Sequence, residues 1–457
     1  MRAPFVIALA VALPGCMVGP DYKRPDTGVP AAFNEPDVGQ GSATLPARWW
    51  TLYNDPLLTS LVEDALVRNA DIRLAAARVE EAEAALREAN ATLWFPLVNG
   101  NAGASRGRSF ATGAPRTGNS YNIGISTSFE VDLWGRLRRA DLAIRDQLLA
   151  TRFGRDTVAL TLAGTVVRTY FSARSLDAQF DASNETLRAA EQSVTLAQKR
   201  ADAGVASALD VYQAGTLRAL AAAQAKDVAR QRAAVVHQLG LLTGRGDLAL
   251  PKGDLSQLPV PVLPPAGLPS ALLERRPDVR QAEAQLAAAT NRIGVARAAQ
   301  FPALTLTGSV GAQSTELASL LDGGSRVWSV GGSLLGPILD GGRYAARTQQ
   351  AEAQAKQAEA TYQRATETAF REVADALSNI RWAADTESDL LARVEQSRQA
   401  LRLAGLRYER GYSGYLEVLD AQRTLNDAQL AALRNRQAYL SYTVDLMNAL
   451  GGGWRPQ

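Results

Sequence analysis

Few residues in this 457-residue chain have the chemistry of a catalytic or metal site. It contains one histidine, His237, and one cysteine, Cys16, although metal sites and most nucleophile–base pairs are built from these residue types. Glu417 and Asp420 would share one helix face, but general acid–base work needs a pocket that separates their pKa values, and the flanking sequence offers only helix surface. His237 stands among Ala, Val and Leu, which indicates a packed side chain. We therefore predict no enzyme, no metal and no other cofactor.

Charge and glycine patterns exclude two further classes of ligand. With 49 basic and 46 acidic residues the net charge is only +3, so no basic face is concentrated enough to indicate nucleic acid. The glycine pairs Gly331–Gly332 and Gly341–Gly342 lack the spacing of a phosphate-binding loop. They stand at strand positions, where they are typical of a barrel.

Residues 1–15 have the features of a secretory signal peptide, with an apolar run from Phe5 to Leu13 that is too short to span a bilayer. The sequence Leu-Pro-Gly-Cys that ends at Cys16 resembles the lipobox of bacterial lipoproteins, with proline where a small residue is usual. The alternative is an ordinary signal peptide with an incidental cysteine. Lipidation is favoured because Cys16 has no second cysteine to pair with in an exported chain. Met17, rather than Asp, follows it, and by resemblance to the lipoprotein sorting rule this implies the outer membrane.

One unit of sequence occurs twice. At an offset of 207 residues, the following pairs match: Gly204 and Gly411, Leu209 and Leu416, Val211 and Val418, Ala214 and Ala421. In each copy a helix-compatible segment ends at the glycine and a second one begins at once, and Gly414 closes the second turn. We therefore predict two fused repeats, each with a helical hairpin at one end.

Long helices are predicted from two proline-free runs, 137–203 and 344–410. A helix of about 67 residues would extend roughly 100 Å. Leu390, Val394, Leu401 and Tyr408 in the second run, and Leu187, Val194 and Ala201 in the first, have heptad-compatible spacing. This spacing indicates coiled-coil packing, and the abundant alanine allows close approach of the helices.

Four strands are predicted from alternation of apolar and polar residues. From Tyr121 to Asp132 every second residue is apolar or aromatic, with one threonine, and its neighbours are small or polar, as in a strand with two different faces. Its partner is expected from Pro96 to Arg106, and the second repeat has similar patterns at 304–313 and 328–334. Strands of roughly ten residues can cross a membrane when tilted, with Tyr121 and Trp328 as candidate interfacial aromatics.

These segments define the expected domain organisation: signal peptide 1–15, lipidated tether 16–55, first repeat 56–246, proline-rich linker 247–269, second repeat 270–450 and tail 451–457. The first repeat would contain helices to about 93, a hairpin at about 96–132, the long helix 137–203 and a return helix 207–242. The second would contain a helix at 277–300, a hairpin at 302–340, the long helix 344–410 and a return helix 414–449.

Four strands cannot close a barrel, and an open edge is not stable in lipid. Two copies would give eight strands, whose interior is filled by side chains, whereas three would give twelve and leave a lumen. We therefore predict a homotrimer. The fold class is mainly α with a membrane β-barrel. The long helices of the two repeats form a coiled-coil barrel, which continues into a β-barrel that trimerisation completes. The result would be a conduit across membrane and periplasm.

The chain resembles the TolC-like outer-membrane factors, specifically the lipoprotein branch similar to OprM and NodT that serves multidrug efflux pumps. The matching features are the lipobox, Trp49-Trp50 with Asp55-Pro56, Asp132–Arg136, Leu416–Arg423 and the ending Asn448–Trp454. They cover nearly the whole chain. The resemblance implies a passive conduit for drugs or other small molecules in the outer membrane, docked through a periplasmic adaptor onto an inner-membrane pump, expected to be of the RND type.

The same resemblance places a gate at the helical tip in the periplasm. Leu416 would form an apolar constriction, and Glu417 and Asp420 would form rings of like charge in a trimer. Asp420 and Arg423, with Asp210 and Tyr408, would hold the tip closed until the adaptor or pump replaces their contacts. A simpler interpretation is that Glu417 and Arg423 are solvated helix positions, where an ion pair contributes little.

Two other functions remain open. A surface lipoprotein that acts as a coiled-coil scaffold would explain the long helices and Cys16 but not four alternating strands. A type I secretion conduit would share the predicted fold.

Overall fold

The computed structural model describes residues 17–26, 28, 32–33, 35, 45–111, 114–266 and 272–454. The signal segment and Cys16 lie outside the described residues. These residues form two compact units. Within the described ranges, no helix combines the length and apolar character needed to cross a membrane.

Each unit contains segments of both sequence repeats. Unit 1 includes residues 77–152 and 281–364 with the N-terminal segment that ends at Asp26, and unit 2 includes residues 27–76, 153–280 and 365–457. The boundary between the units differs from the boundary between the repeats because the long helices α4 (Arg136–Asp202) and α8 (Arg343–Glu409) each contribute residues to both units. Each of these helices has 67 residues, which confirms the expected uninterrupted helices.

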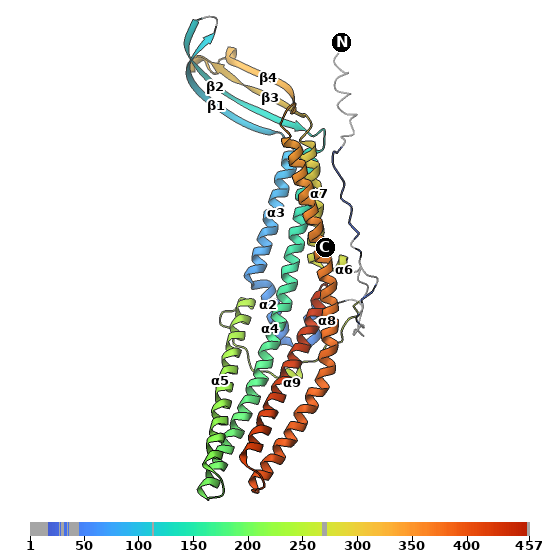
Figure 1. Ribbon diagram of the computed structural model, residues 1–457. Coiled ribbons are helices and arrows are strands. Elements are labelled where there is room, and N and C mark those ends of the chain that lie inside the picture. Colours follow the sequence, from blue (N-terminus) through green and yellow to red (C-terminus); the bar gives the residue numbers. More distant parts are fainter. Residues whose placement is uncertain are drawn as a thin grey trace. The chain divides into compact units, whose positions relative to one another are not determined.

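The sheet of unit 1 has four antiparallel strands in the order β1-β2-β3-β4 (Figure 1). Their bounds are β1 (Leu97–Ala111), β2 (Ala114–Val131), β3 (Ala303–Ser314) and β4 (Arg326–Leu335). The expected number of strands is confirmed, but the prediction that the first ends at Arg106 and the second begins at Tyr121 was wrong. Backbone pairing continues to Ala111 and Ala114, because strand hydrogen bonds do not require alternating side chains.

The register gives the sheet one apolar and one polar face. Directly paired residues share a face, and Ile125 pairs with Val310, which pairs with Trp328. On the other face Ser126 pairs with Ser309, whose hydroxyl lies 2.8 Å from that of Ser329. The outer edges of β1 and β4 have no partner strand within the described residues. The sheet therefore has two different faces and two open edges.

The other helices of the described residues are short connectors or partners of α4 and α8. They are η1 (Trp49–Tyr53), α2 (Pro56–Arg68), α3 (Ala70–Trp94), α5 (Ala208–Thr243), η2 (Leu255–Gln257), α6 (Leu272–Arg275), α7 (Pro277–Ala298), η4 (Leu317–Ser319), η5 (Gly323–Ser325) and α9 (Tyr415–Ala449). Asp55 caps α2, because its Oδ1 accepts hydrogen bonds from the backbone N–H of Leu57 and Leu58 at 2.9 and 3.1 Å, and Pro56 takes the first helical position.

The N-terminal segment of unit 1 has no helix or strand from residue 17 to 26. Polar contacts attach it to its own unit. Arg24 forms an ion pair with Glu283 of α7 at 2.7 Å, and Asp21 forms one with the buried Arg139 of α4 at 2.7 Å. The chain directly after Cys16 is therefore bound to the helices of unit 1.

Aromatic residues form the core of unit 2 where η1 meets α4. Trp49 and Tyr53 are almost fully buried, and the ring of Tyr53 packs edge-on against that of Phe171 at 5.0 Å. The hydroxyl of Tyr53 lies 2.7 Å from that of Thr443 in α9. Burial raises the pKa of the Tyr53 hydroxyl. The Trp-Trp sequence singled out above thus contributes to packing.

Candidate functional site

Both helical hairpins of unit 2 turn in the same way (Figure 1). In the α4–α5 turn the N–H of Val205 donates to the carbonyl of Arg200 at 3.0 Å, and in the α8–α9 turn the N–H of Tyr412 donates to that of Arg407 at 2.8 Å. This is the Schellman pattern, which requires a left-handed residue after the helix. Gly204 and Gly411 supply it with φ of 72° and 80°. Gly414 has an extended conformation and occupies the N-cap position of α9.

A small core lies beneath these turns, and we call it the tip core: Ala197, Ala214, Ala404, Tyr408, Tyr415 and Val418. The rings of Tyr408 and Tyr415 pack edge to face with centroids 5.4 Å apart. Alanines from α4 and α5 leave room for these rings, so both hairpins contribute to one packed cluster.

Arg200 connects the two hairpins, and sequence reasoning missed it. Its Nη1 donates to the backbone carbonyl of Glu409 at 2.9 Å, and its guanidinium lies 4.8 Å from the ring centroid of Tyr408, within cation–π range. The repeat contained a signal, because Arg200 corresponds to Arg407 at the offset of 207. Arg407 instead forms an ion pair with Glu417 of its own hairpin at 3.1 Å. The two repeats therefore use equivalent arginines differently.

The structure brings some of the predicted gate residues together and leaves others apart. Tyr408 is buried, and burial, followed by the nearby carboxylate of Asp210, raises the pKa of its hydroxyl. Asp420 and Arg423 are exposed and line a groove of about 440 Å³ beside Leu217 of α5. Neither takes part in an ion pair within the described part of the chain. Within one chain, Asp420 and Arg423 thus do not join Tyr408 and Asp210.

The remaining tip residues face outward. Leu416 is 63% exposed, and the Glu417 side chain is 51% exposed. A leucine this exposed at the end of a helical hairpin is free to contact another chain or to border a pore. Glu417 and Asp420 present two carboxylates from the first turns of α9, where carboxylates are favourable to the helix dipole.

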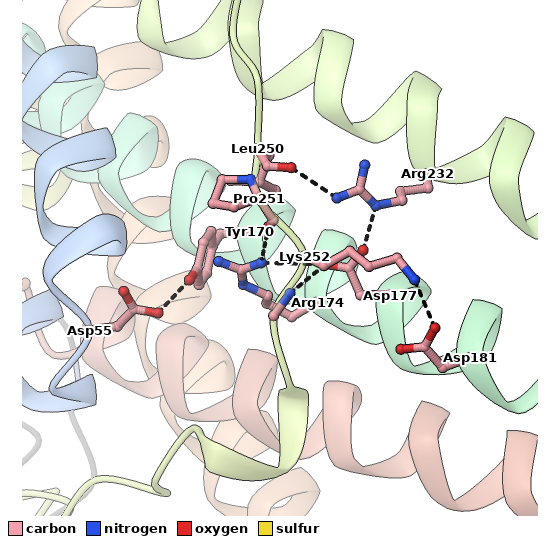
Figure 2. Close-up of polar contacts among 10 residues, drawn as sticks. Asp55, Tyr170, Arg174, Asp177, Asp181, Arg232, Leu250, Pro251 and Lys252 are labelled. Atoms are coloured by element: carbon pink, nitrogen blue, oxygen red, sulfur yellow. Dashed lines mark hydrogen bonds and ion pairs between the residues drawn. The ribbon is translucent and has the colours of Figure 1, made fainter.

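A buried polar network, which sequence reasoning also missed, binds the linker between the repeats to α4 and α5 (Figure 2). Asp177 of α4 is completely buried. It accepts hydrogen bonds from Arg232 of α5 and, at 3.1 Å, from the backbone N–H of Gly253. Arg174 donates to the carbonyl of Pro251 at 2.6 Å and to Asp177 at 3.3 Å.

The network is satisfied from several directions. Arg232 also donates to the carbonyl of Leu250 at 3.0 Å, and Lys252 pairs with the more exposed Asp181 at 2.8 Å. The guanidinium of Arg174 lies 4.6 Å from the ring centroid of Tyr170, and Tyr170 donates to Asp55. The only sequence signal was an Arg and an Asp three residues apart in α4, and this spacing does not identify their partners.

Tyr121 and Trp328 lie on the apolar face of the sheet. Tyr121 pairs with Ser314, and Trp328 pairs with Val310 and is 78% exposed. The described residues contain no group of three or more metal-ligating side chains placed to hold an ion. The candidate functional features are therefore the pair of coupled helical turns in unit 2 and the amphipathic sheet in unit 1.

Comparison with known proteins identifies the chain's relatives. The sequence profile of the family "Outer membrane efflux protein" matches twice, at residues 61–245 and 268–452, which is again an offset of 207. The chain is 37% identical over 453 residues to the solvent efflux pump outer membrane protein SrpC of Pseudomonas putida, covering 97% of this chain and 96% of SrpC. It is 34% identical over 460 residues to the cation efflux system protein CusC of Escherichia coli, covering 99% and 98%.

Solved structures of outer-membrane channels are also similar to this chain. The open state of the MtrE outer membrane channel of Neisseria gonorrhoeae has a TM-score of 0.86 and 32% identity, covering 96% of this chain and 99% of that one. The outer-membrane channel OprN has a TM-score of 0.90 and 31% identity, covering 96% and 100%. The family is one of channels and not of enzymes. The chain therefore belongs to the outer membrane efflux protein family: it is an outer-membrane channel of the kind that serves tripartite efflux systems.

Proposed function

We propose that this protein forms a passive homotrimeric conduit that carries drugs or other small molecules across the periplasm and outer membrane. The observation that carries the proposal is a four-stranded sheet with one apolar face, one polar face and two open edges. An unpaired edge cannot be left in lipid, where each unsatisfied backbone group is costly. Three copies supply twelve strands, enough to enclose a water-filled lumen lined by the Ser, Asn and Gly face.

The trimer is tested by the mass of the complex and by its conductance. Native mass spectrometry of the detergent-extracted protein should give three copies, and the same preparation should produce discrete conductance steps in a planar bilayer. A single-copy mass would refute the trimer. Absence of conductance for wild type and for the double variant Glu417→Ala/Asp420→Ala would instead favour a scaffold.

The gate is proposed at the helical tip in the periplasm. Leu416, Glu417, Asp420 and Arg423 are exposed near the α8–α9 turn, so in a trimer three copies of each would surround the axis. Tyr408 belongs to the tip core, and the carboxylate of Asp210 lies near its hydroxyl. Opening would exchange contacts of this tip for contacts with a partner, which shifts a two-state equilibrium. Asp420→Ala should therefore raise the conductance at fixed voltage, whereas Asp227→Ala, an exposed carboxylate change on α5 away from the tip, should not.

The membrane attachment and the partners complete the proposal. Cys16 is proposed to carry the lipid, since it is the only cysteine of an exported chain, and the chain directly after it is bound to unit 1 by Arg139 and Glu283.

The partners are a periplasmic adaptor and an inner-membrane pump of the RND type. SrpC is named for solvent efflux and CusC for cation efflux. Because similar channels are named for such different cargoes, we assign the choice of cargo to the pump. The assembly is tested by purifying this protein and asking whether the adaptor and the pump that are encoded beside its gene purify with it.

A further inference from the structure

The apolar face of the sheet begins with a stretch that carries no charge. Gly100 of β1 lies on this face, since it pairs with Ile125, and strand alternation places every second residue from it on the same face. From Val98 to Ala104 these residues are Val, Gly, Ala and Ala on β1. From Leu334 to Trp328 they are Leu, Gly, Val and Trp on β4. Both edge strands thus begin with an uncharged face at the end that the helices α3 and α8 join.

Three arginines end this uncharged face, at the same distance from the helices on both edge strands. Arg106 is the tenth residue of β1 counted from its first residue, and Arg326 is the tenth residue of β4 counted back from its last. Arg108 lies two residues beyond Arg106 and so on the same face. All three side chains are exposed, and no ion pair joins their guanidinium groups to another described residue. Three cations are therefore available to a ligand on the apolar side of the sheet.

The length of the uncharged face matches the apolar layer of a membrane. The nine steps between the first and tenth residues of β1, at about 3.4 Å each, extend about 31 Å along the strand. A tilt of about 35–45°, usual in membrane barrels, reduces this to about 22–25 Å along the membrane normal, and the apolar band of such barrels is about 25 Å tall. Aromatic residues mark the boundary of that band. Trp328 stands two residues from Arg326, and Tyr121 pairs with Ala104, two residues from Arg106. The arginines therefore lie at the boundary farther from the helices.

Arginine at this boundary has one favourable kind of partner. A guanidinium in the hydrocarbon layer is costly, and the long side chain allows the charge to reach the headgroup layer instead. A phosphate group there can accept two parallel N–H bonds from one guanidinium. The described strands offer no competing anion on this face, because their only carboxylate, that of Glu130, pairs with Thr305 on the polar face. Glu316 and Asp322 stand in the loop between β3 and β4, and neither forms an ion pair with Arg326. The charge on this face therefore selects a phosphorylated lipid.

We propose that Arg106, Arg108 and Arg326 bind the phosphate groups of lipids in the outer leaflet of the outer membrane. The ligand is a phosphorylated lipid and not a free phosphate, because its acyl chains lie along the apolar face while its phosphate meets the guanidinium groups. The inference rests on the proposed insertion of the sheet in the membrane and adds a lipid-binding site to it. In a trimer the arginines would be repeated three times around the barrel and would form a basic collar.

Native mass spectrometry of the detergent-extracted full-length protein, titrated with lipid A that bears two phosphates, tests the site. Wild type should bind this lipid in a saturable way. Arg106→Gln/Arg108→Gln/Arg326→Gln should bind it at least about tenfold more weakly, because the charge-assisted hydrogen bonds to phosphate are lost. Equal affinities of wild type and this triple variant would overturn the proposal.

The matched control removes the same number of positive charges elsewhere. Arg73, Arg78 and Arg87 of α3 are also exposed, so Arg73→Gln/Arg78→Gln/Arg87→Gln should bind lipid A as wild type does. A control that binds as weakly as the test variant would mean that net charge alone drives binding, and it would overturn the site.

Two further ligands separate the phosphorylated lipid from a free anion and from apolar contact alone. Dephosphorylated lipid A should bind wild type no better than lipid A binds the triple variant, and equal binding of both lipid forms to wild type would overturn the role of the phosphate. Inorganic phosphate at the same concentration should not displace lipid A, because it gains nothing from the apolar face. Displacement would mean a site for small anions and would overturn the lipid as the ligand.

The mass of the complex separates this site from the proposed trimer. Every variant is first checked for a three-copy mass, and Arg108→Gln/Arg326→Gln replaces the triple variant if that variant fails the check. A three-copy mass with undiminished binding of lipid A to the test variant overturns the lipid site and leaves the trimer intact. A one-copy mass of wild type overturns the trimer, and arginine-dependent binding of lipid A to that single copy would still support the site.

Discussion

Replacing Asp177 with alanine should destabilise unit 2 substantially. The carboxylate is completely buried and accepts hydrogen bonds from Arg232, Arg174 and the backbone of Gly253. Its removal leaves two guanidinium groups without their counter-ion. Removing one partner of a buried ion pair typically costs about 3–5 kcal/mol, because the remaining charge is uncompensated.

The structure favours the lower end of that range. Arg174 keeps its bond to the carbonyl of Pro251, and Arg232 keeps its bond to that of Leu250. The Arg232 side chain is also 23% exposed, so water can solvate part of its charge. We expect a loss of about 3 kcal/mol, which at about 2 °C per kcal/mol lowers the Tm by about 6 °C.

The assay is thermal unfolding of the detergent-solubilised protein, followed by far-ultraviolet circular dichroism. Asp181→Ala is the matched control on the same helix, because its ion pair with Lys252 is exposed on both sides, 65% and 55%, and such a pair contributes at most about 1 kcal/mol. Asp177→Asn, which keeps the shape but removes the charge, should fall between them. Equal Tm values for Asp177→Ala and Asp181→Ala would refute the assignment of stability to this network.

Three further predictions concern the tip, the base of the sheet and the anchor. Arg200→Ala removes the bond to Glu409 and should raise single-channel conductance, whereas Arg407→Ala, within one hairpin, should change it less; equal conductances would contradict the coupling. Hydrogen bonds from the backbone N–H groups of Tyr344 and Gly342 lower the pKa of Asp340, so its cap on α8 is intact above its ordinary pKa and is lost as pH falls through the lowered one. The protection factor against hydrogen exchange in the first turn of α8, which corrects for the intrinsic pH dependence of exchange, should therefore fall only in acid for wild type but should already be low at neutral pH for Asp340→Ala. A wild-type protection factor that does not depend on pH would count against the cap. Cys16→Ser should abolish incorporation of radiolabelled palmitate, and retained label would exclude Cys16 as the acceptor.

Local patterns account for what could be predicted. The proline-free runs became α4 and α8 within one residue of the expected bounds, because helix formation depends on residues within a few positions of each other. Alternation located the strands, but it did not locate the end of β1 or the start of β2. These segments pair through their backbones without alternating side chains. The asymmetry of Arg200 and Arg407 was also invisible, because equivalent positions in the repeats face different neighbours.

The amino-acid order by itself determined the repeat, the helical hairpins with Gly204 and Gly411 at their turns, and a sheet with two different faces. Each depends on periodicity or on the backbone freedom of glycine, and both are properties of short segments. Only the tertiary structure decided that Asp177 meets Arg232 and Gly253, that Tyr408 lies above alanines of the other hairpin, and that arginines end the apolar face at the same level on both edge strands. These pairings join residues tens to hundreds of positions apart, and packing in three dimensions selects them.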